Sequence, residues 1–150
     1  VGSVKGRTGR RTAAPRGAAP RAAAALVAAA RRARRGAYAP YSRYRVGAAA
    51  LASDGTVFSG ANVENASYGL SMCAERVAIF QAAASGHRKV RAVAVVTDSR
   101  NPAAPCGACR QVMAEFGVEV VYLAGVRGVP RTRRFADLLP EAFTSRNLTT

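Results

Sequence analysis

The sequence predicts an α/β sandwich built on a mixed, mostly parallel sheet. After a first helix, the apolar patterns indicate a hairpin of two strands and then two helices, each followed by a strand. Strands joined by a helical crossover run parallel, so the second hairpin strand and the two later strands should share one direction. The hairpin would supply one antiparallel edge.

Proline, glycine and apolar runs delimit the expected elements. Pro20 suits a first helical turn, Gly86 suits a helix end, and the pair Asp54-Gly55 signals a tight hairpin turn. The expected helices are 20–35, 72–85 and 106–116, with a further helical turn at 136–139. The expected strands are 45–52, 56–63, 90–97 and 118–123, with a short fifth strand near 131–135.

Basic residues are concentrated at the beginning of the chain. Residues 1–53 hold twelve Lys or Arg and no acid, whereas residues 54–150 hold eleven Lys or Arg and all eight acids. We expect residues 1–19, rich in Gly, Pro, Ala and Arg, to form a basic disordered arm, and residues 20–150 to form one domain. The arm lacks the interleaved aromatic residues of a nucleic-acid platform, which favours a solvated tail over a polynucleotide contact.

The apolar residues are not arranged as a membrane span or a secretory signal. No stretch contains eighteen strongly apolar residues, and arginine and proline interrupt the alanine-rich beginning. We therefore expect no membrane partner and a cytoplasmic location.

Three cysteines have the spacing of a metal site. Their odd number argues against a closed disulfide framework, so we expect a reducing compartment. Cys73, Cys106 and Cys109 all fall at the expected beginnings of helices, where the positive end of the helix dipole favours thiolates. Three protein ligands leave the fourth position of Zn²⁺ open for water, which is typical of a catalytic site.

Glu75 makes this pattern specific. It lies two positions after Cys73, close enough to exchange protons with water on the ion. The signature of zinc deaminases is His or Cys, one spacer, Glu, and later Pro-Cys-x-x-Cys, which this chain completes with Pro105, Cys106 and Cys109. The residues therefore predict a zinc-dependent deaminase with Glu75 as its acid–base group.

Three thiolates on Zn²⁺ carry a net charge of −1, which weakens acidification of the bound water. The helix N-termini would offset this charge in part, and Arg76 would donate hydrogen bonds to the thiolate sulfurs; the alternative is a surface arginine. A structural zinc with His87 as fourth ligand is disfavoured, because a helix of about 20 Å separates His87 from Cys73. The remaining alternative is a set of inert, buried cysteines.

Together with other segments, these motifs resemble the cytidine deaminase family of the short, homotetrameric, three-cysteine zinc type, over about residues 38–143. The further segments are 39–48 (APYSRYRVGA), 62–68 (NVENASY), 109–111 (CRQ) and 138–143 (LLPEAF). The resemblance implies a three-layer sandwich with a mixed, mostly parallel five-stranded sheet. It also implies hydrolytic deamination of cytidine or 2′-deoxycytidine to the uridine nucleoside and ammonia, in pyrimidine salvage, with a zinc-bound hydroxide attacking C4.

The resemblance implies substrate contacts within one subunit. Asn62 and Glu64 would bind the ribose hydroxyls, and Tyr44, where the family usually has Phe, would lie against the pyrimidine. Asn65 and the backbone of Ala66 would frame the base. The alternatives are a solvated loop charge for Glu64 and an ordinary core aromatic for Tyr44.

The resemblance also implies a homotetramer whose sites are shared between subunits. Phe143 would reach the site of a neighbouring subunit, unless it is a core aromatic, and Tyr68 would lie at a subunit boundary. Other functions remain open: a deaminase of a modified nucleoside such as blasticidin S, a polynucleotide cytosine deaminase, and a zinc-stabilised interaction protein. The run from Asn62 to Asn65 favours an ordinary ribose.

Overall fold

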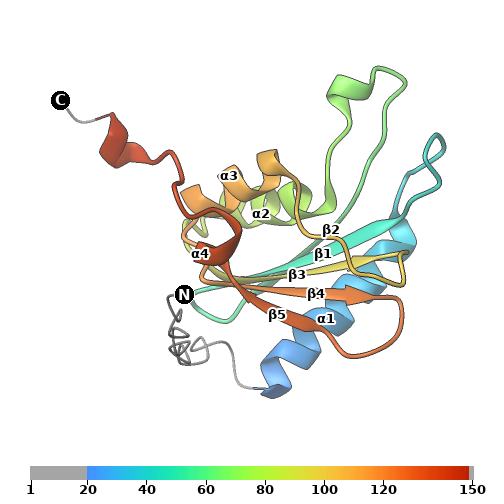
Figure 1. Ribbon diagram of the computed structural model, residues 1–150, viewed down its shortest axis with the longest axis horizontal. Coiled ribbons are helices and arrows are strands. Elements are labelled where there is room, and N and C mark those ends of the chain that lie inside the picture. The colour runs from blue at the N-terminus through green and yellow to red at the C-terminus, as the bar shows by residue number, and fades with distance from the viewer. Residues whose placement is uncertain (1–19, 149–150) are drawn as a thin grey trace, which may run out of the picture.

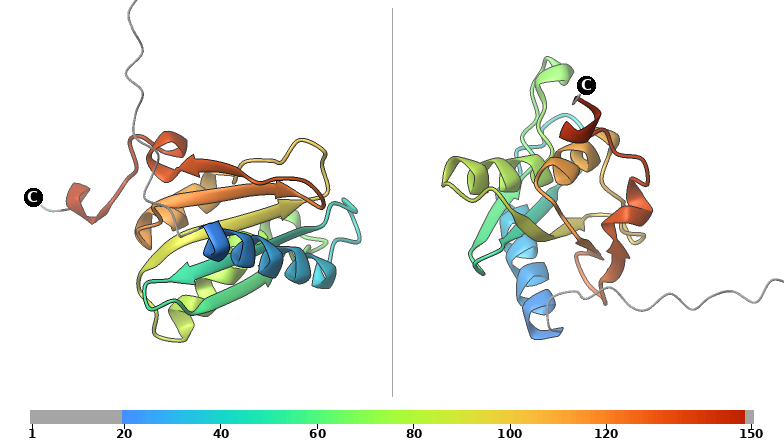
Figure 2. Two further views of the ribbon diagram at one scale, coloured as in Figure 1. Left: turned by 90° about the horizontal axis from the view of Figure 1, so that it is seen from below. Right: turned by 90° about the vertical axis from the view of Figure 1, so that its left-hand side faces the viewer.

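A computed structural model describes residues 20–148, which form three layers around one five-stranded sheet (Figure 1). Helix α1 covers one face of the sheet, and α2 and α3 cover the other (Figure 2). The α-helices are α1 (Pro20–Ala33), α2 (Ala74–Ala84), α3 (Gly107–Glu115) and α4 (Phe135–Leu138). The strands are β1 (Val46–Ala52), β2 (Val57–Ala61), β3 (Val90–Thr97), β4 (Val120–Gly125) and β5 (Arg131–Arg134). The predicted arm at residues 1–19 lies outside the described residues.

The strand order is β2-β1-β3-β4-β5, and it both confirms and corrects the predicted sheet. The sheet is mixed, and β2, β3 and β4 share one direction, as expected from their helical crossovers. The pairing is nevertheless mostly antiparallel, because only β3 and β4 are parallel neighbours. The reason is that β1 lies between β2 and β3 and runs antiparallel to both. The hairpin of β1 and β2 does form one antiparallel edge of the sheet, as predicted.

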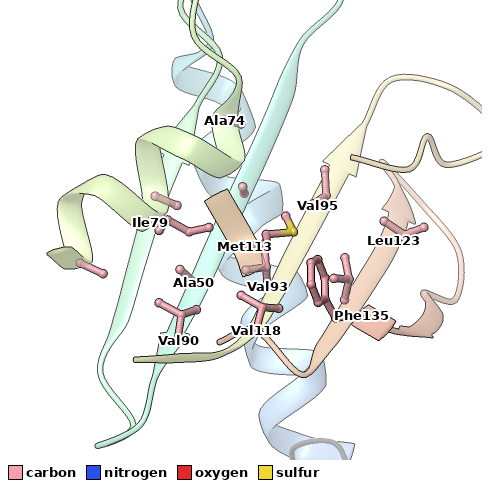
Figure 3. Close-up of a cluster of buried hydrophobic side chains, with 14 residues drawn as sticks. Ala50, Ala74, Ile79, Val90, Val93, Val95, Met113, Val118, Leu123 and Phe135 are labelled. Carbon is pink, nitrogen blue, oxygen red and sulfur yellow. The ribbon is translucent and has the colours of Figure 1, made fainter. Parts of the chain in front are cut away.

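Alternation along the strands divides the core into two clusters. Ala48 and Ala50 of β1 face α2 and α3, whereas Ala49 faces α1. Ile79 of α2 and Met113 of α3 point toward the sheet in the first cluster (Figure 3). A sheet that is buried on both faces explains why β3 is almost continuously apolar.

Two glycines let helices lie directly on the sheet. A Cβ atom added at Gly60 of β2 would lie 2.6 Å from the amide nitrogen of Ala78 and 2.7 Å from the carbonyl oxygen of Ala74, both in α2. A Cβ atom added at Gly47 of β1 would lie 2.2 Å from the carbonyl oxygen of Ala30 in α1. Gly60 therefore sets how closely the first turn of α2 approaches the sheet.

Short 3₁₀ turns follow α1, occupy the connection from β2 to α2, and lie beyond α4. They are η1 (Arg34–Gly36), η2 (Tyr68–Leu70) and η3 (Ser145–Asn147). The first helix thus ends slightly earlier than predicted. No helix within residues 20–148 is long and apolar enough to cross a membrane.

Candidate active site

The three cysteines come together at the beginnings of two neighbouring helices. Cys73 is the N-cap residue of α2, Cys106 is the N-cap residue of α3, and Cys109 lies in the first turn of α3. Their sulfur atoms all lie within 4.8 Å of one another, and the Sγ atoms of Cys73 and Cys106 are 3.9 Å apart. All three cysteines are free thiols. The structure therefore brings together the metal-ligand set that the spacing predicts.

This sulfur cluster fits Zn²⁺. Tetrahedral coordination with Zn–S bonds of about 2.3 Å requires sulfur atoms about 3.8 Å apart, close to the separation of Cys73 and Cys106. Among the described residues, the cluster contains no fourth His, Cys, Asp or Glu. A closed four-ligand site is thus disfavoured, and one coordination position would stay open.

His87 lies in a different environment. Its Nε2 atom is 3.0 Å from Oδ2 of Asp54, and its ring packs 4.8 Å from the ring of Phe58. The side chain is partly buried against the β1–β2 hairpin. The contact with Asp54 gives His87 a structural partner away from the thiols.

The pKa values of Cys73 and Cys109 are shifted in opposite directions. A hydrogen bond from the Cys109 thiol, followed by one from Arg76, lowers the pKa of Cys73 well below its usual value. The same bond to Cys73, together with burial and the charge of Glu75, raises the pKa of Cys109. Cys73 therefore becomes a thiolate more readily than Cys109, and a cation in the cluster would favour ionisation of its ligands.

Arg76 contacts the cluster directly. Its Nη2 atom donates to Sγ of Cys73 across 3.7 Å, and the side chain is half-buried. The predicted alternative of a surface arginine therefore does not describe this side chain. The guanidinium is placed to offset part of the negative charge of the thiolates.

Glu75 is buried beside these thiols. Only 5% of its surface is exposed, and this burial raises the pKa of its carboxyl group to about 7. Glu75 follows the cap residue Cys73 by two positions, in the first turn of α2. A carboxyl group that changes charge near neutral pH is suited to accepting and returning protons.

A cavity of about 340 Å³ opens above the cluster. It brings Glu75, Cys73 and Cys106 together with three residues expected to bind substrate, Tyr44, Asn62 and Glu64. Other lining residues had no predicted role: Ser42, Val46, Ser71, Met72, Ala74, Val95, Thr97, Ala103 and Ala104. The volume lies within the range of small-molecule sites.

Asn62 and Glu64 also form hydrogen bonds to residues 41–46, which we call the entry segment. Ser42, Tyr44 and Val46 of this segment line the cavity. Oδ1 of Asn62 accepts the N–H of Val46 at 2.8 Å, and Nδ2 donates to the carbonyl oxygen of Tyr44 at 2.9 Å. The Glu64 carboxylate accepts the N–H groups of Tyr41 and Ser42 at 2.9 and 3.2 Å, and the hydroxyl of Ser42. Glu64 is thus more than a solvated loop charge.

Four predicted site residues lie outside the cavity of a single chain. Asn65 and Ala66 are exposed, and Oδ1 of Asn65 accepts the N–H of Ser67 in a local turn. Tyr68 is 74% exposed and meets Tyr41 edge to face. Phe143 is 58% exposed, so it is not a core aromatic.

Three cavity residues that sequence reasoning missed are polar: Ser42, Ser71 and Thr97. Ser42 belongs to a segment of the family resemblance, but its residue type alone indicated no chemistry. Thr97 is a buried polar residue at the carboxyl end of β3. In open α/β sheets, sites form where strands end, and this rule could have identified Thr97.

Comparisons with known proteins agree with this geometry. The family model for the "Cytidine and deoxycytidylate deaminase zinc-binding region" matches residues 20–124. The cytidine deaminase of Halalkalibacterium halodurans is 54% identical over 118 residues, which cover 77% of this chain and 89% of the relative. A cytidine deaminase of Mycobacterium tuberculosis is 46% identical over 108 residues, covering 72% of this chain and 79% of that relative.

Solved structures of the same kind superpose closely. The crystal structure of cytidine deaminase from Burkholderia pseudomallei gives a TM-score of 0.76 at 54% identity, covering 80% of this chain and 98% of that one. That from Mycobacterium tuberculosis gives 0.68 at 43% identity, covering 81% and 96%. The sulfur cluster, the buried glutamate and these matches lead to one conclusion: the chain belongs to the cytidine and deoxycytidylate deaminase family and carries its zinc-binding region.

Proposed function

We propose that this protein hydrolyses cytidine and 2′-deoxycytidine to uridine and 2′-deoxyuridine with release of ammonia, in pyrimidine salvage. The observation that carries the proposal is that one cavity joins Glu75 and two clustered thiols to polar groups suited to a sugar, Asn62 and Glu64. Zn²⁺ is the cofactor of this family.

Cys73, Cys106 and Cys109 would hold the ion. When bound, Zn²⁺ supplies a Lewis acid that lowers the pKa of a water molecule. Arg76 would moderate the charge of the three thiolates through its bond to Cys73. Replacing Arg76 with alanine should lower turnover and shift its pH dependence, and unchanged values of both would argue against this role.

Glu75 would carry the protons of the reaction. It accepts a proton from the attacking water and delivers it to N3 of the pyrimidine, while the water oxygen bonds to C4. It then transfers the remaining hydroxyl proton to the exocyclic amine, the C4–N bond breaks, and ammonia leaves. The burial of Glu75, which raises the pKa of its carboxyl group to about 7, supports this role because one group must both accept and donate protons.

Asn62 and Glu64 would bind the sugar, and Tyr44 would lie along the base. Each of the two polar side chains keeps hydrogen-bonding capacity beyond its contacts with the entry segment. A negative charge at Glu64 would also repel a nearby phosphate, which favours a nucleoside over a nucleotide.

Asn65 and the backbone of Ala66 would frame the base, and Tyr68 and Phe143 would act in a homotetramer whose sites are shared between subunits. The exposure of large apolar side chains in a single chain supports the homotetramer. Tyr68 is 74% exposed and its near neighbour Leu70 is 70% exposed, as is typical of residues that contact another subunit. Sedimentation should then give four chains per particle. A monomer with full activity would argue against shared sites.

We place the protein in the cytoplasm, because three free thiols need a reducing environment to remain ligands.

The absorbance change of cytidine, followed with and without a chelator, tests the proposed reaction. We expect ammonia and uridine in equal amounts, and loss of activity with the chelator. Activity on blasticidin S or on cytosine in oligonucleotides, with none on cytidine, would contradict the proposal.

A further inference from the structure

Five hydrogen bonds connect the entry segment, residues 41–46, to the side chains of Asn62 and Glu64. Asn62 bonds to its far end, and Glu64 accepts three hydrogen bonds from its near end, from the Tyr41 N–H, the Ser42 N–H and the Ser42 hydroxyl. The Oγ atom of Ser42 also accepts the N–H of Tyr44 at 3.0 Å. Ser42 thus links the carboxylate of Glu64 to the backbone of Tyr44 through one hydroxyl.

The backbone within this segment is strained. Arg43 has a φ of 57°, and among the described residues it is the one non-glycine residue with a positive φ. This left-handed conformation costs roughly 1–2 kcal/mol for a residue with a side chain, so it persists only where surrounding contacts impose it. The contacts that impose it flank Arg43 on both sides, at Ser42 and Tyr44.

These contacts limit how Glu64 can bind another group. A carboxylate has about four acceptor positions, and donors from Tyr41 and Ser42 occupy three of them. One position is left for a ligand. Glu64 and Ser42 line both the main cavity and an adjoining one of about 360 Å³, so they stand where the two join.

We propose that Ser42 is a positioning residue for sugar recognition. Its hydroxyl holds the Glu64 carboxylate so that the remaining acceptor position meets one hydroxyl of the nucleoside sugar, and its contact with the Tyr44 N–H couples that position to the placement of the Tyr44 ring. This inference rests on the proposed deaminase function and adds a residue to it. Ser42 touches Glu64 and acts on the substrate through it.

The test compares substrates with and without the 2′- and 3′-hydroxyls of the sugar. Ser42→Ala should raise KM for cytidine roughly tenfold, since a hydrogen bond to a charged group is lost, and should leave kcat within about threefold. For 2′,3′-dideoxycytidine, which has no hydroxyl for Glu64, the same substitution should change kcat/KM less than threefold. Ser42→Thr keeps the hydroxyl and should restore the KM for cytidine.

A double-mutant cycle separates orientation of Glu64 from general damage to the fold. In a Glu64→Gln background, Ser42→Ala should raise KM for cytidine by less than about threefold, because the carboxylate it orients is gone. Ser53→Ala is the matched control, because Ser53 is an exposed serine in the β1–β2 turn, away from the cavity. It should leave both kinetic constants unchanged.

Each result decides the matter. Equal losses on cytidine and dideoxycytidine, a Ser42→Thr variant as impaired as Ser42→Ala, or loss of zinc or of a cooperative melt in Ser42→Ala would each overturn the role of Ser42. Wild-type protein that deaminates none of these nucleosides would instead overturn the proposed function itself.

Discussion

Glu75 illustrates how one residue joins the chemistry of the site to the stability of the protein. Burial raises the pKa of this carboxyl group from 4.5 to about 7, so in the zinc-free protein its charged form is disfavoured by folding. The destabilisation is absent below the unfolded pKa of 4.5, grows between these two pKa values, and is complete above pH 7. It vanishes if the group cannot ionise.

Glu75→Gln should therefore stabilise the zinc-free protein at pH 8, by roughly 1–3 kcal/mol, and have little effect near pH 4.5. Thermal or urea unfolding of the zinc-free protein at both pH values measures this difference. A glutamine variant that is no more stable than the wild type at pH 8 would show that the carboxylate is well solvated in the fold.

The sequence predicted the residues of the metal cluster better than those of the sugar site. Cys106 and Cys109 share one helix turn, and Glu75 lies two positions from Cys73, so local spacing was enough to associate them with one ion. Ser42 meets Glu64 across 22 positions through a strained turn. No local sequence pattern predicts such a contact, because it depends on how two loops pack against each other.

At the scale of elements, the approach of α2 to β2 controls the site. Gly60 leaves no room for a Cβ atom against the backbone of Ala74 and Ala78, so Gly60→Ala must move the turn of α2 that carries Glu75 and follows Cys73. We expect a loss of roughly 1–3 kcal/mol in unfolding free energy and weaker zinc binding. Gly36→Ala is the control, since an added Cβ atom there meets nothing within 4 Å.

Urea unfolding and zinc competition with a chelator measure both effects of these variants. If Gly60→Ala bound zinc and unfolded like Gly36→Ala, the packing of α2 on β2 would not position the site.

The elements themselves were predicted within a few residues, because glycine, proline and the period of apolar residues act locally. The place of β1 inside the sheet was not, because pairing between distant strands leaves no signature in either strand alone.

At the scale of the whole molecule, Asp98 connects the end of β3 to two other parts of the fold. It pairs with Arg34 in η1, and its Oδ2 atom accepts the N–H of Arg45 at 3.0 Å, just before β1. Asp98→Ala should reduce the unfolding free energy by about 1–2 kcal/mol, because the backbone N–H of Arg45 and the guanidinium of Arg34 both lose their acceptor. Asp137→Ala breaks the exposed pair with Arg134 and should change stability little.

Equilibrium unfolding of the two aspartate variants checks this difference, and equal losses would argue against a long-range clamp at Asp98.

Composition separated the basic residues 1–19 from the rest of the chain, and we expect a protein that lacks them to keep its kcat/KM on cytidine. A steep fall in activity after their removal, or a strong salt dependence of cytidine turnover, would assign these residues a part in the reaction.

Zinc titration into metal-free protein, with ammonia release from cytidine as the readout, tests the central claim most directly. In the wild type, activity should rise until one zinc is bound per chain and then level off. Glu75→Gln should bind the same single zinc while its turnover falls by roughly 10²–10⁴ or more. Full activity without zinc, or a glutamine variant as fast as the wild type, would contradict a deaminase built on three thiolates and a buried carboxyl group.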